Sequence, residues 1–205
     1  MSASRRLGVL AIMMVIAQPA WAHHPMGGKL PQTFLQGLLS GFGHPVIGVD
    51  HLAAIVGVGI LAALAGRSAA VVLAFSVSVI AGVGLHLSGI DLPASELFVG
   101  LTTLLIGALV ILRQSMSAGR ALLLFALAGL VHGYALGESI IGAEASPLVA
   151  YLLGLLIMQT AIGVVVYAAV RSLARWPART TGLTVAGVLV ALAGGIATAA
   201  AAGLA

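Results

Sequence analysis

Six long runs of apolar residues constrain what this chain can fold into more than any other feature. They lie at residues 45–65, 69–89, 95–112, 120–140, 147–170 and 181–203. An α-helix needs about 20 apolar residues to cross a bilayer, and each run is close to that length. Of the 205 residues 61% are hydrophobic and 7% are charged, whereas about a quarter are charged in a soluble domain. The sequence predicts an all-α, polytopic membrane protein with a six-helix bundle over residues 44–205.

The N-terminus has the pattern of a secretory signal peptide. Two arginines precede an apolar stretch that is too short to span a membrane, and Ala20-Trp21-Ala22 offers a small-residue cleavage site. We predict a signal peptide at 1–22, followed by an external segment at 23–43 in which residues 33–42 form an interfacial helix. The alternative is an anchor that is not cleaved.

The loops between the apolar runs alternate in charge. Every second loop carries arginine: Arg67, then Arg113 and Arg120, then Arg171, Arg175 and Arg179. The other loops carry Asp91, Glu96 and Glu144 and no lysine or arginine. The positive-inside rule places the arginine loops in the cytoplasm and the N-terminus outside, as a cleaved signal peptide also requires.

Charge and cysteine content exclude several function classes. Nine lysines and arginines stand against five acidic residues, but most of the arginines lie in the loops, so the basic excess reflects topology and not nucleic-acid binding. With no cysteine, the chain has no disulfides, no thiolate metal site and no cysteine nucleophile. It contains no nucleotide-binding motif, so the chain does not itself couple to ATP.

Ionisable residues inside two apolar runs are the strongest functional signal. His44 is followed six positions later by Asp50 and then by His51, and His132 is followed six positions later by Glu138. Such side chains are costly in hydrocarbon and mark functional sites. Imidazole and carboxylate without thiolate suit a divalent transition metal. The alternatives are a His–Asp pair that ties helices together and a solvated glutamate at a helix end.

The two patterns lie three spans apart, so their helices run in opposite directions. This arrangement fits a 3+3 inverted repeat with a site at the repeat interface. In a regular helix His44 and His51 share one face about 10 Å apart. That distance suits two stations on a path, whereas one shared site needs a bend near Pro45 and Gly48. Asp50 either orients a histidine or binds the ion directly.

Two further groups of side chains are candidates for a transport path. His23 and His24, at the predicted mature N-terminus, and His86, near the outer end of the second run, are candidate metal-capture residues. Snorkelling explains His86 equally well. Candidate path residues lie midway along the fifth run: Met158, Gln159 and Thr160. Their alternative role is hydrogen bonding between helices.

These residues resemble the HupE/UreJ family of nickel permeases, which are associated with hydrogenase maturation and urease. The His44-x5-Asp50-His51 pattern is similar to the family's first-helix motif. The run from His132 to Gly137 resembles its fourth-helix motif. The family motif often has a second histidine where Leu136 stands and a glutamate where Ser139 stands; here Glu138 takes the place of that glutamate. The likeness covers nearly the whole chain.

The resemblance implies a permease or secondary transporter of the bacterial inner membrane, and not an enzyme. It would import a divalent ion, Ni²⁺ first and Co²⁺ or Cu²⁺ as alternatives, from periplasm to cytoplasm. The ion is cargo, and no cofactor is permanently bound. The implied metal ligands are His44, Asp50, His51, His132 and Glu138. Homo-oligomerisation stays open.

Two rival functions remain. A membrane-embedded metal-dependent enzyme could use an open metal position to activate water, although no His-Glu-x-x-His motif or serine nucleophile motif occurs. A haem-binding subunit needs paired histidines on facing helices, whereas all six histidines are predicted on the outer side.

Overall fold

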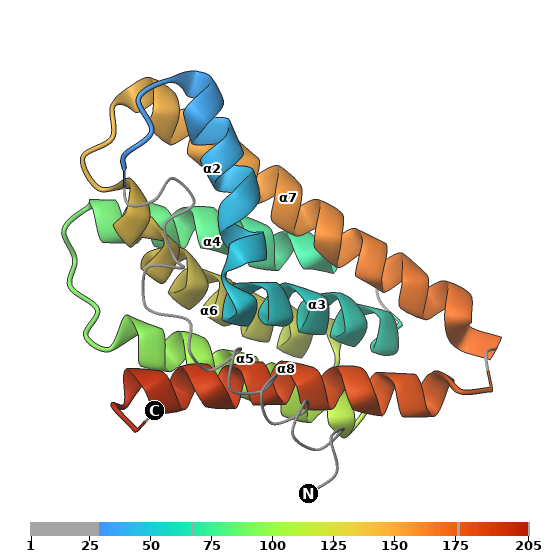
Figure 1. Ribbon diagram of the computed structural model, residues 1–205. Coiled ribbons are helices and arrows are strands. Elements are labelled where there is room, and N and C mark those ends of the chain that lie inside the picture. Colours follow the sequence, from blue (N-terminus) through green and yellow to red (C-terminus); the bar gives the residue numbers. More distant parts are fainter. Residues whose placement is uncertain (1–28, 67, 176, 205) are drawn as a thin grey trace, which may run out of the picture.

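The computed structural model describes residues 29–66, 68–175 and 177–204, and helices dominate it (Figure 1). In chain order these are α2 (Phe34–Ile47), α3 (Val49–Leu64), α4 (Ala70–Leu87), α5 (Ser95–Ile111), α6 (Ala118–Gly137), the short 3-10 helix η2 (Glu138–Ile140), α7 (Ala145–Ser172), the short 3-10 helix η3 (Leu173–Arg175) and α8 (Arg179–Ala201). The described residues contain no strand, which confirms the all-α class. The predicted signal peptide, with His23 and His24, lies outside these ranges.

The helices from α4 onward begin and end close to the predicted apolar runs. Four of the described helices are long and apolar enough to cross a membrane: α4, α6 continued by η2, α7 continued by η3, and α8. The α2–α3 pair is a fifth if it counts as one span. α5 is also apolar but has only 17 residues, or about 25 Å of helix, and is shorter than these four helices. The predicted number of six spans is therefore not confirmed, and the inverted repeat stays a prediction.

The first predicted span is not a straight helix. Predicted at 45–65, it takes in the last residues of α2 and all of α3, and these two helices meet at Gly48 and are bent by 79°. Pro45 lies inside α2 and not at the first position of a span. Its ring has no N–H to donate, which weakens the last turn of α2 before the corner. The site therefore forms around a corner of the backbone.

Close helix pairs surround this corner. α2 runs beside the first half of α7 in the same direction, and any side chain at Gly37 or Gly41 would collide with the α7 backbone at Pro147 or Tyr151. The residues predicted as an interfacial helix, 33–42, form the N-cap and the first part of α2, and their place at the membrane interface stays a prediction. Glycines also let α4 approach α6 and α5 approach α8. α3 runs through the middle and contacts α5, α7 and α8.

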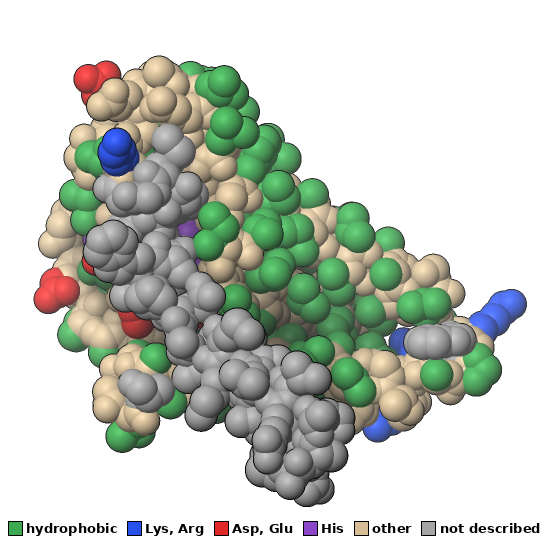
Figure 2. Space-filling view, in the orientation of Figure 1, with side chains coloured by type: hydrophobic (Ala, Val, Ile, Leu, Met, Phe, Trp, Pro, Cys, Tyr) green, Lys and Arg blue, Asp and Glu red, His purple; other side chains and the backbone are tan. Residues whose placement is uncertain are grey.

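Charged residues gather at opposite ends of the helices. The described arginines flank the ends of α5 and α7 and the starts of α6 and α8: Arg113, Arg120, Arg171, Arg175 and Arg179. Four acidic residues lie at the other ends: Asp91, Glu96, Glu138 and Glu144. Figure 2 shows the acidic side chains on the left of the visible face. The predicted topology requires this separation of charge. Among the described lysines and arginines, only Lys29, before α2, does not lie at the arginine end.

Candidate metal site

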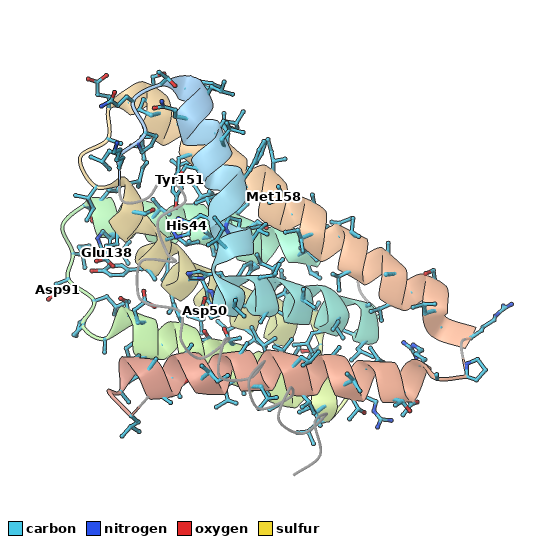
Figure 3. All side chains as sticks on the ribbon, in the orientation of Figure 1. His44, Asp50, Asp91, Glu138, Tyr151 and Met158 are labelled. Carbon is cyan, nitrogen blue, oxygen red and sulfur yellow. The ribbon has the colours of Figure 1, made fainter. Side chains whose placement is uncertain are left out.

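The corner between α2 and α3 brings His44 and His51 together. His44 lies in the last turn of α2, and His51 lies in the first turn of α3. Their ring centroids are 6.3 Å apart in a T-shaped arrangement. Both side chains are buried, with 3% and 4% of their surface exposed. Of the two arrangements left open by the sequence, the bent backbone is the one observed, with His44 and Asp50 at the corner (Figure 3).

His132 of α6 reaches the same point from across the bundle. Its Nδ1 lies 2.7 Å from Nδ1 of His51, and the ring centroids are 4.9 Å apart. His132 is 1% exposed. In the absence of a metal ion, one of the two nitrogens must carry a proton and the other must accept it. The two predicted patterns therefore meet through their histidines.

Two threonines of α5 set the tautomer of His132. Oγ1 of Thr102 lies 3.2 Å and Oγ1 of Thr103 lies 3.4 Å from Nε2 of His132. Both hydroxyls donate to carbonyls in the preceding turn of α5: Thr102 to Phe98 at 2.8 Å and Thr103 to Val99 at 2.9 Å. A hydroxyl that has given its proton to a carbonyl can only accept, so Nε2 is the protonated nitrogen of His132. The unprotonated Nδ1 then faces His51.

His44 is held in a comparable way from η2 and α7. Its Nδ1 lies 3.0 Å from the Tyr151 hydroxyl and 3.2 Å from Oγ of Ser139. These hydroxyls also lie 2.9 Å and 3.0 Å from the carbonyl of Leu136. When both donate to that carbonyl, they accept from Nδ1–H of His44, and Nε2 is the unprotonated nitrogen that can bind a metal ion.

Sequence reasoning missed Tyr151, and it treated Ser139 only as a departure from a motif. The sequence held one signal for each residue. Tyr151 is a hydroxyl-bearing side chain inside an apolar run, and Ser139 follows Glu138 at the end of another. Neither signal identifies His44 as the partner, because the contact spans 95 residues for Ser139 and 107 for Tyr151.

Asp50 lies in the first turn of α3 beside the histidines. Its Oδ1 accepts a hydrogen bond from the backbone N–H of His51 at 2.8 Å, and the side chain is 8% exposed. A carboxylate at a helix N-terminus is favoured by the helix dipole. Oγ1 of Thr103 also lies 3.4 Å from the carbonyl of Asp50, so α5 packs directly against this turn. Asp50 therefore supplies a negative charge at the corner and fixes the start of α3.

Glu138 does not join this cluster. It is exposed at the start of η2, beyond the end of α6. Among the described residues, no group of three histidine, aspartate or glutamate side chains is arranged to hold a metal ion. The structure thus holds one close imidazole pair, with a third imidazole and a carboxylate as neighbours.

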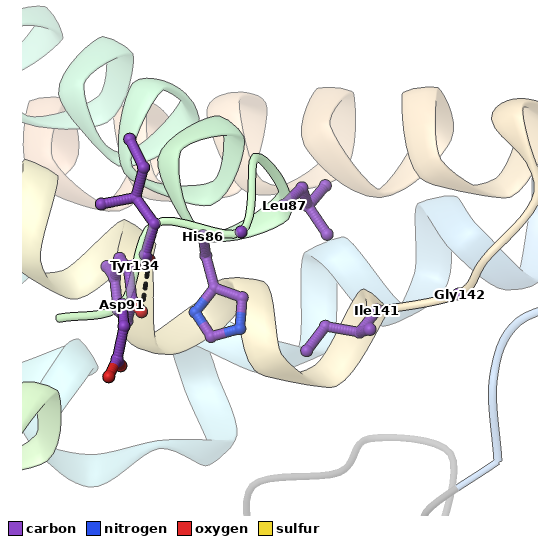
Figure 4. Close-up of a pocket in the computed structure, with 8 residues that line it drawn as sticks. His86, Leu87, Asp91, Tyr134, Ile141 and Gly142 are labelled. Carbon is purple, nitrogen blue, oxygen red and sulfur yellow. Dashed lines mark hydrogen bonds between the residues drawn. The ribbon is translucent and has the colours of Figure 1, made fainter. Parts of the chain in front are cut away.

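His86 lies apart, in a cavity of about 470 Å³ at the acidic end of the bundle (Figure 4). Its ring lies against that of Tyr134, with centroids 4.4 Å apart. The Tyr134 hydroxyl donates to the carbonyl of Ile90 and accepts from the N–H of Leu92, both at 2.8 Å. These bonds fix the loop that carries Asp91, which also lines the cavity. Nδ1 of His86 is buried and has no partner among the described residues.

Three buried oxygen atoms on α4 and α7 also lack a described partner: Oγ of Ser76, Oε1 of Gln159 and Oγ1 of Thr160. A buried polar atom without a hydrogen bond is costly, so each calls for water or an ion. Met158, the remaining candidate of this group, is half-buried.

The packing of Gly163 locates these oxygens relative to the histidines. A side chain at Gly163 of α7 would meet Val72 of α4 and Ile55 of α3. Four residues, or about one helical turn, separate each of these residues from a polar one nearer the corner at Gly48. These polar residues are Gln159 on α7, Ser76 on α4 and His51 on α3. The unpartnered oxygens of Gln159 and Ser76 therefore lie at about the depth of His51.

Comparison with known proteins adds an independent line of evidence. The family model described as HupE / UreJ protein matches residues 10–197. The chain is also similar to Protein HupE of Rhizobium leguminosarum bv. viciae, with 32% identity over 131 residues. That match covers 63% of this chain and 66% of the relative, slightly less than two thirds of its length. No solved structure matches the chain.

Proposed function

Because the chain belongs to the HupE/UreJ family, we propose that it carries a divalent transition-metal ion across a membrane, with Ni²⁺ as its cargo. Proteins of this family are associated with transport and are not enzymes. The metal-dependent enzyme is therefore no longer a rival function. The family and the apolar helices together make this a multi-pass membrane protein.

The close approach of His51 and His132 is the observation that carries the proposal. Two imidazole nitrogens bound at right angles to one ion, each at about 2.1 Å, lie about 3.0 Å apart. The two Nδ1 atoms are already 2.7 Å apart, so to bind one ion they would separate by only a few tenths of an ångström while both rings turn to face it. It would replace the proton that the two nitrogens share. His44 and the Asp50 carboxylate are the nearest further donors at the corner.

The donor set favours the later first-row metals. Imidazole nitrogen suits nickel, copper and zinc, whereas an all-oxygen set would suit magnesium or calcium. We therefore keep Co²⁺ and Cu²⁺ as alternative cargoes. Measuring how strongly Co²⁺ and Cu²⁺ compete with Ni²⁺ for uptake distinguishes the three cargoes.

We propose import from the acidic end of the bundle toward the arginine end, across the bacterial inner membrane. The cavity that His86 and Asp91 line lies at the acidic end and would receive the ion first. The His51–His132 pair would bind it next. The oxygens of Ser76, Gln159 and Thr160, beside the pair, would then take the ion onward. Hydroxyl and amide oxygens bind such ions more weakly than imidazole does, and a path needs stations that also release.

Uptake of radioactive Ni²⁺ by cells that express the protein tests this function. We expect uptake by the wild type and its loss in His132→Ala, because that change removes one nitrogen of the pair. Glu138→Gln is the matched control, since Glu138 is exposed and outside the cluster. Uptake that survives His132→Ala at equal expression would mean that the pair is structural. Equal absence of Ni²⁺, Co²⁺ and Cu²⁺ uptake by the wild type would refute the transport proposal.

A further inference from the structure

An apolar groove of about 300 Å³ lies between α3, α7 and α8 at the arginine end of the bundle. Side chains of all three helices line it, among them Ile60, Val166, Val170 and Leu183. Figure 2 shows the visible face hollowed between α7 and α8, with hydrophobic side chains in the hollow. Apart from Arg179, every residue that lines the groove is apolar. An apolar groove of this kind suits a hydrocarbon chain.

Arg179 is the exception, and its position calls for an anion. Nε of Arg179 is buried and has no hydrogen-bond partner among the described residues. A buried guanidinium N–H without an acceptor is costly. Arg179 is also the first residue of α8, whose N-cap makes no side-chain hydrogen bond to the helix. The positive end of the helix dipole therefore adds to the charge of the guanidinium.

An apolar groove beside a guanidinium whose Nε lacks a described partner matches one class of ligand. We propose that the groove holds an acyl chain of an anionic phospholipid and that Arg179 binds its phosphate. Guanidinium groups bind phosphate with two parallel hydrogen bonds. Basic pockets between transmembrane helices on the cytoplasmic side are known binding sites for anionic lipids. A free phosphate would leave the apolar lining uncovered, and a neutral chain would leave Nε unpaired.

A second copy of this chain fits the groove less well. In a membrane, two copies with the same orientation bring their arginine ends to the same level. The described acidic residues outside the site all lie at the other end: Asp91, Glu96, Glu138 and Glu144. A neighbouring copy would therefore bring arginine, and no carboxylate, to Arg179. Lipid phosphate supplies the missing negative charge.

Native mass spectrometry of the purified full chain in detergent tests the proposal, with phosphatidylglycerol and a diacylglycerol of identical chains, which lacks the phosphate, as probes. For the wild type we expect roughly tenfold tighter binding of phosphatidylglycerol, which corresponds to one or two charge-assisted hydrogen bonds. Arg179→Gln should remove that preference. Arg175→Gln is the control, because Arg175 is exposed at the same end and does not line the groove.

A second variant tests the groove with the arginine intact. Ala186→Leu places a larger side chain in the lining and should weaken binding of both lipids several-fold. Equal binding of the two lipids by the wild type would overturn the proposal, as would an Arg179→Gln variant that behaves like Arg175→Gln. A change from oligomer to monomer in Ala186→Leu, without a change in lipid binding, would assign the groove to a second copy. Inorganic phosphate that competes fully with phosphatidylglycerol would assign Arg179 to free anions.

Discussion

The Nδ1 atoms of His51 and His132 lie 2.7 Å apart although 81 residues separate them in the chain. α3 and α6 bring them together, while Thr102 and Thr103 of α5 fix the protonated nitrogen of His132. Two imidazoles in hydrogen-bond contact at the centre of an apolar bundle form a site in which a metal ion and a proton compete for the same position.

The first prediction concerns the corner at Gly48. A Cβ atom at this position would lie 2.8 Å from Cδ2 of His51 and 3.3 Å from Oδ1 of Asp50. Gly48→Ala should therefore push the His51 ring away from His132, with a loss of stability of about 1–3 kcal/mol from overpacking and a large loss of metal uptake. Gly84→Ala is the control, because nothing lies within 4 Å of its Cβ position. Equal uptake in the two variants would show that the His51 position does not matter for transport.

The second prediction tests how His44 is oriented. Tyr151→Phe keeps the ring and removes the hydroxyl that lies 3.0 Å from Nδ1 of His44. Loss of such a supporting hydrogen bond typically lowers metal affinity by about tenfold or more. Isothermal titration of the purified protein with Ni²⁺ measures the effect. Thr184→Val, which removes a hydroxyl bonded within α8, should leave the affinity unchanged; a Tyr151→Phe protein with the same affinity would remove His44 from the site.

Much of the fold could be read from the sequence because apolar length determines where a membrane helix begins and ends. The corner at Gly48 could not be read from the sequence in the same way. Pro45 is compatible with a helix start, and the lack of space at Gly48 comes from the folded position of the His51 ring. The site, too, was predictable only in part. His44, Asp50, His51 and His132 stand out as ionisable groups in apolar runs, whereas Ser139 and Tyr151 act through contacts that only the tertiary structure creates.

The third prediction concerns pH. The metal-binding form of the His51–His132 pair has no proton between its two nitrogens, so ion binding shifts the His51 proton from Nδ1 to Nε2 and leaves both imidazoles neutral. Protons compete with the ion for the two Nδ1 atoms, because only the neutral imidazole binds a metal, and uptake should therefore fall as the pH is lowered. The initial rate of Ni²⁺ uptake in cells held at a series of pH values measures the effect. A rate that does not fall on acidification would mean that the ion does not bind between the two Nδ1 atoms.

The fourth prediction separates the path from the binding site. Gln159→Leu removes a buried oxygen that has no described partner and keeps a side chain of similar length. If this oxygen is the station next to the histidines, the variant should bind Ni²⁺ as tightly as the wild type and transport it several-fold more slowly. Ser76→Ala should act in the same direction.

Ile157→Leu provides the matched control for the path, because Ile157 lies two residues before Gln159 on α7 and is 53% exposed. Its replacement should leave both affinity and rate unchanged. Binding and uptake are measured on the same variants, by titration of purified protein and by the initial rate in cells. A Gln159→Leu protein that loses affinity would place Gln159 in the binding site itself. A variant that keeps both affinity and rate would exclude the Gln159 oxygen from the path, because the change removes that oxygen entirely.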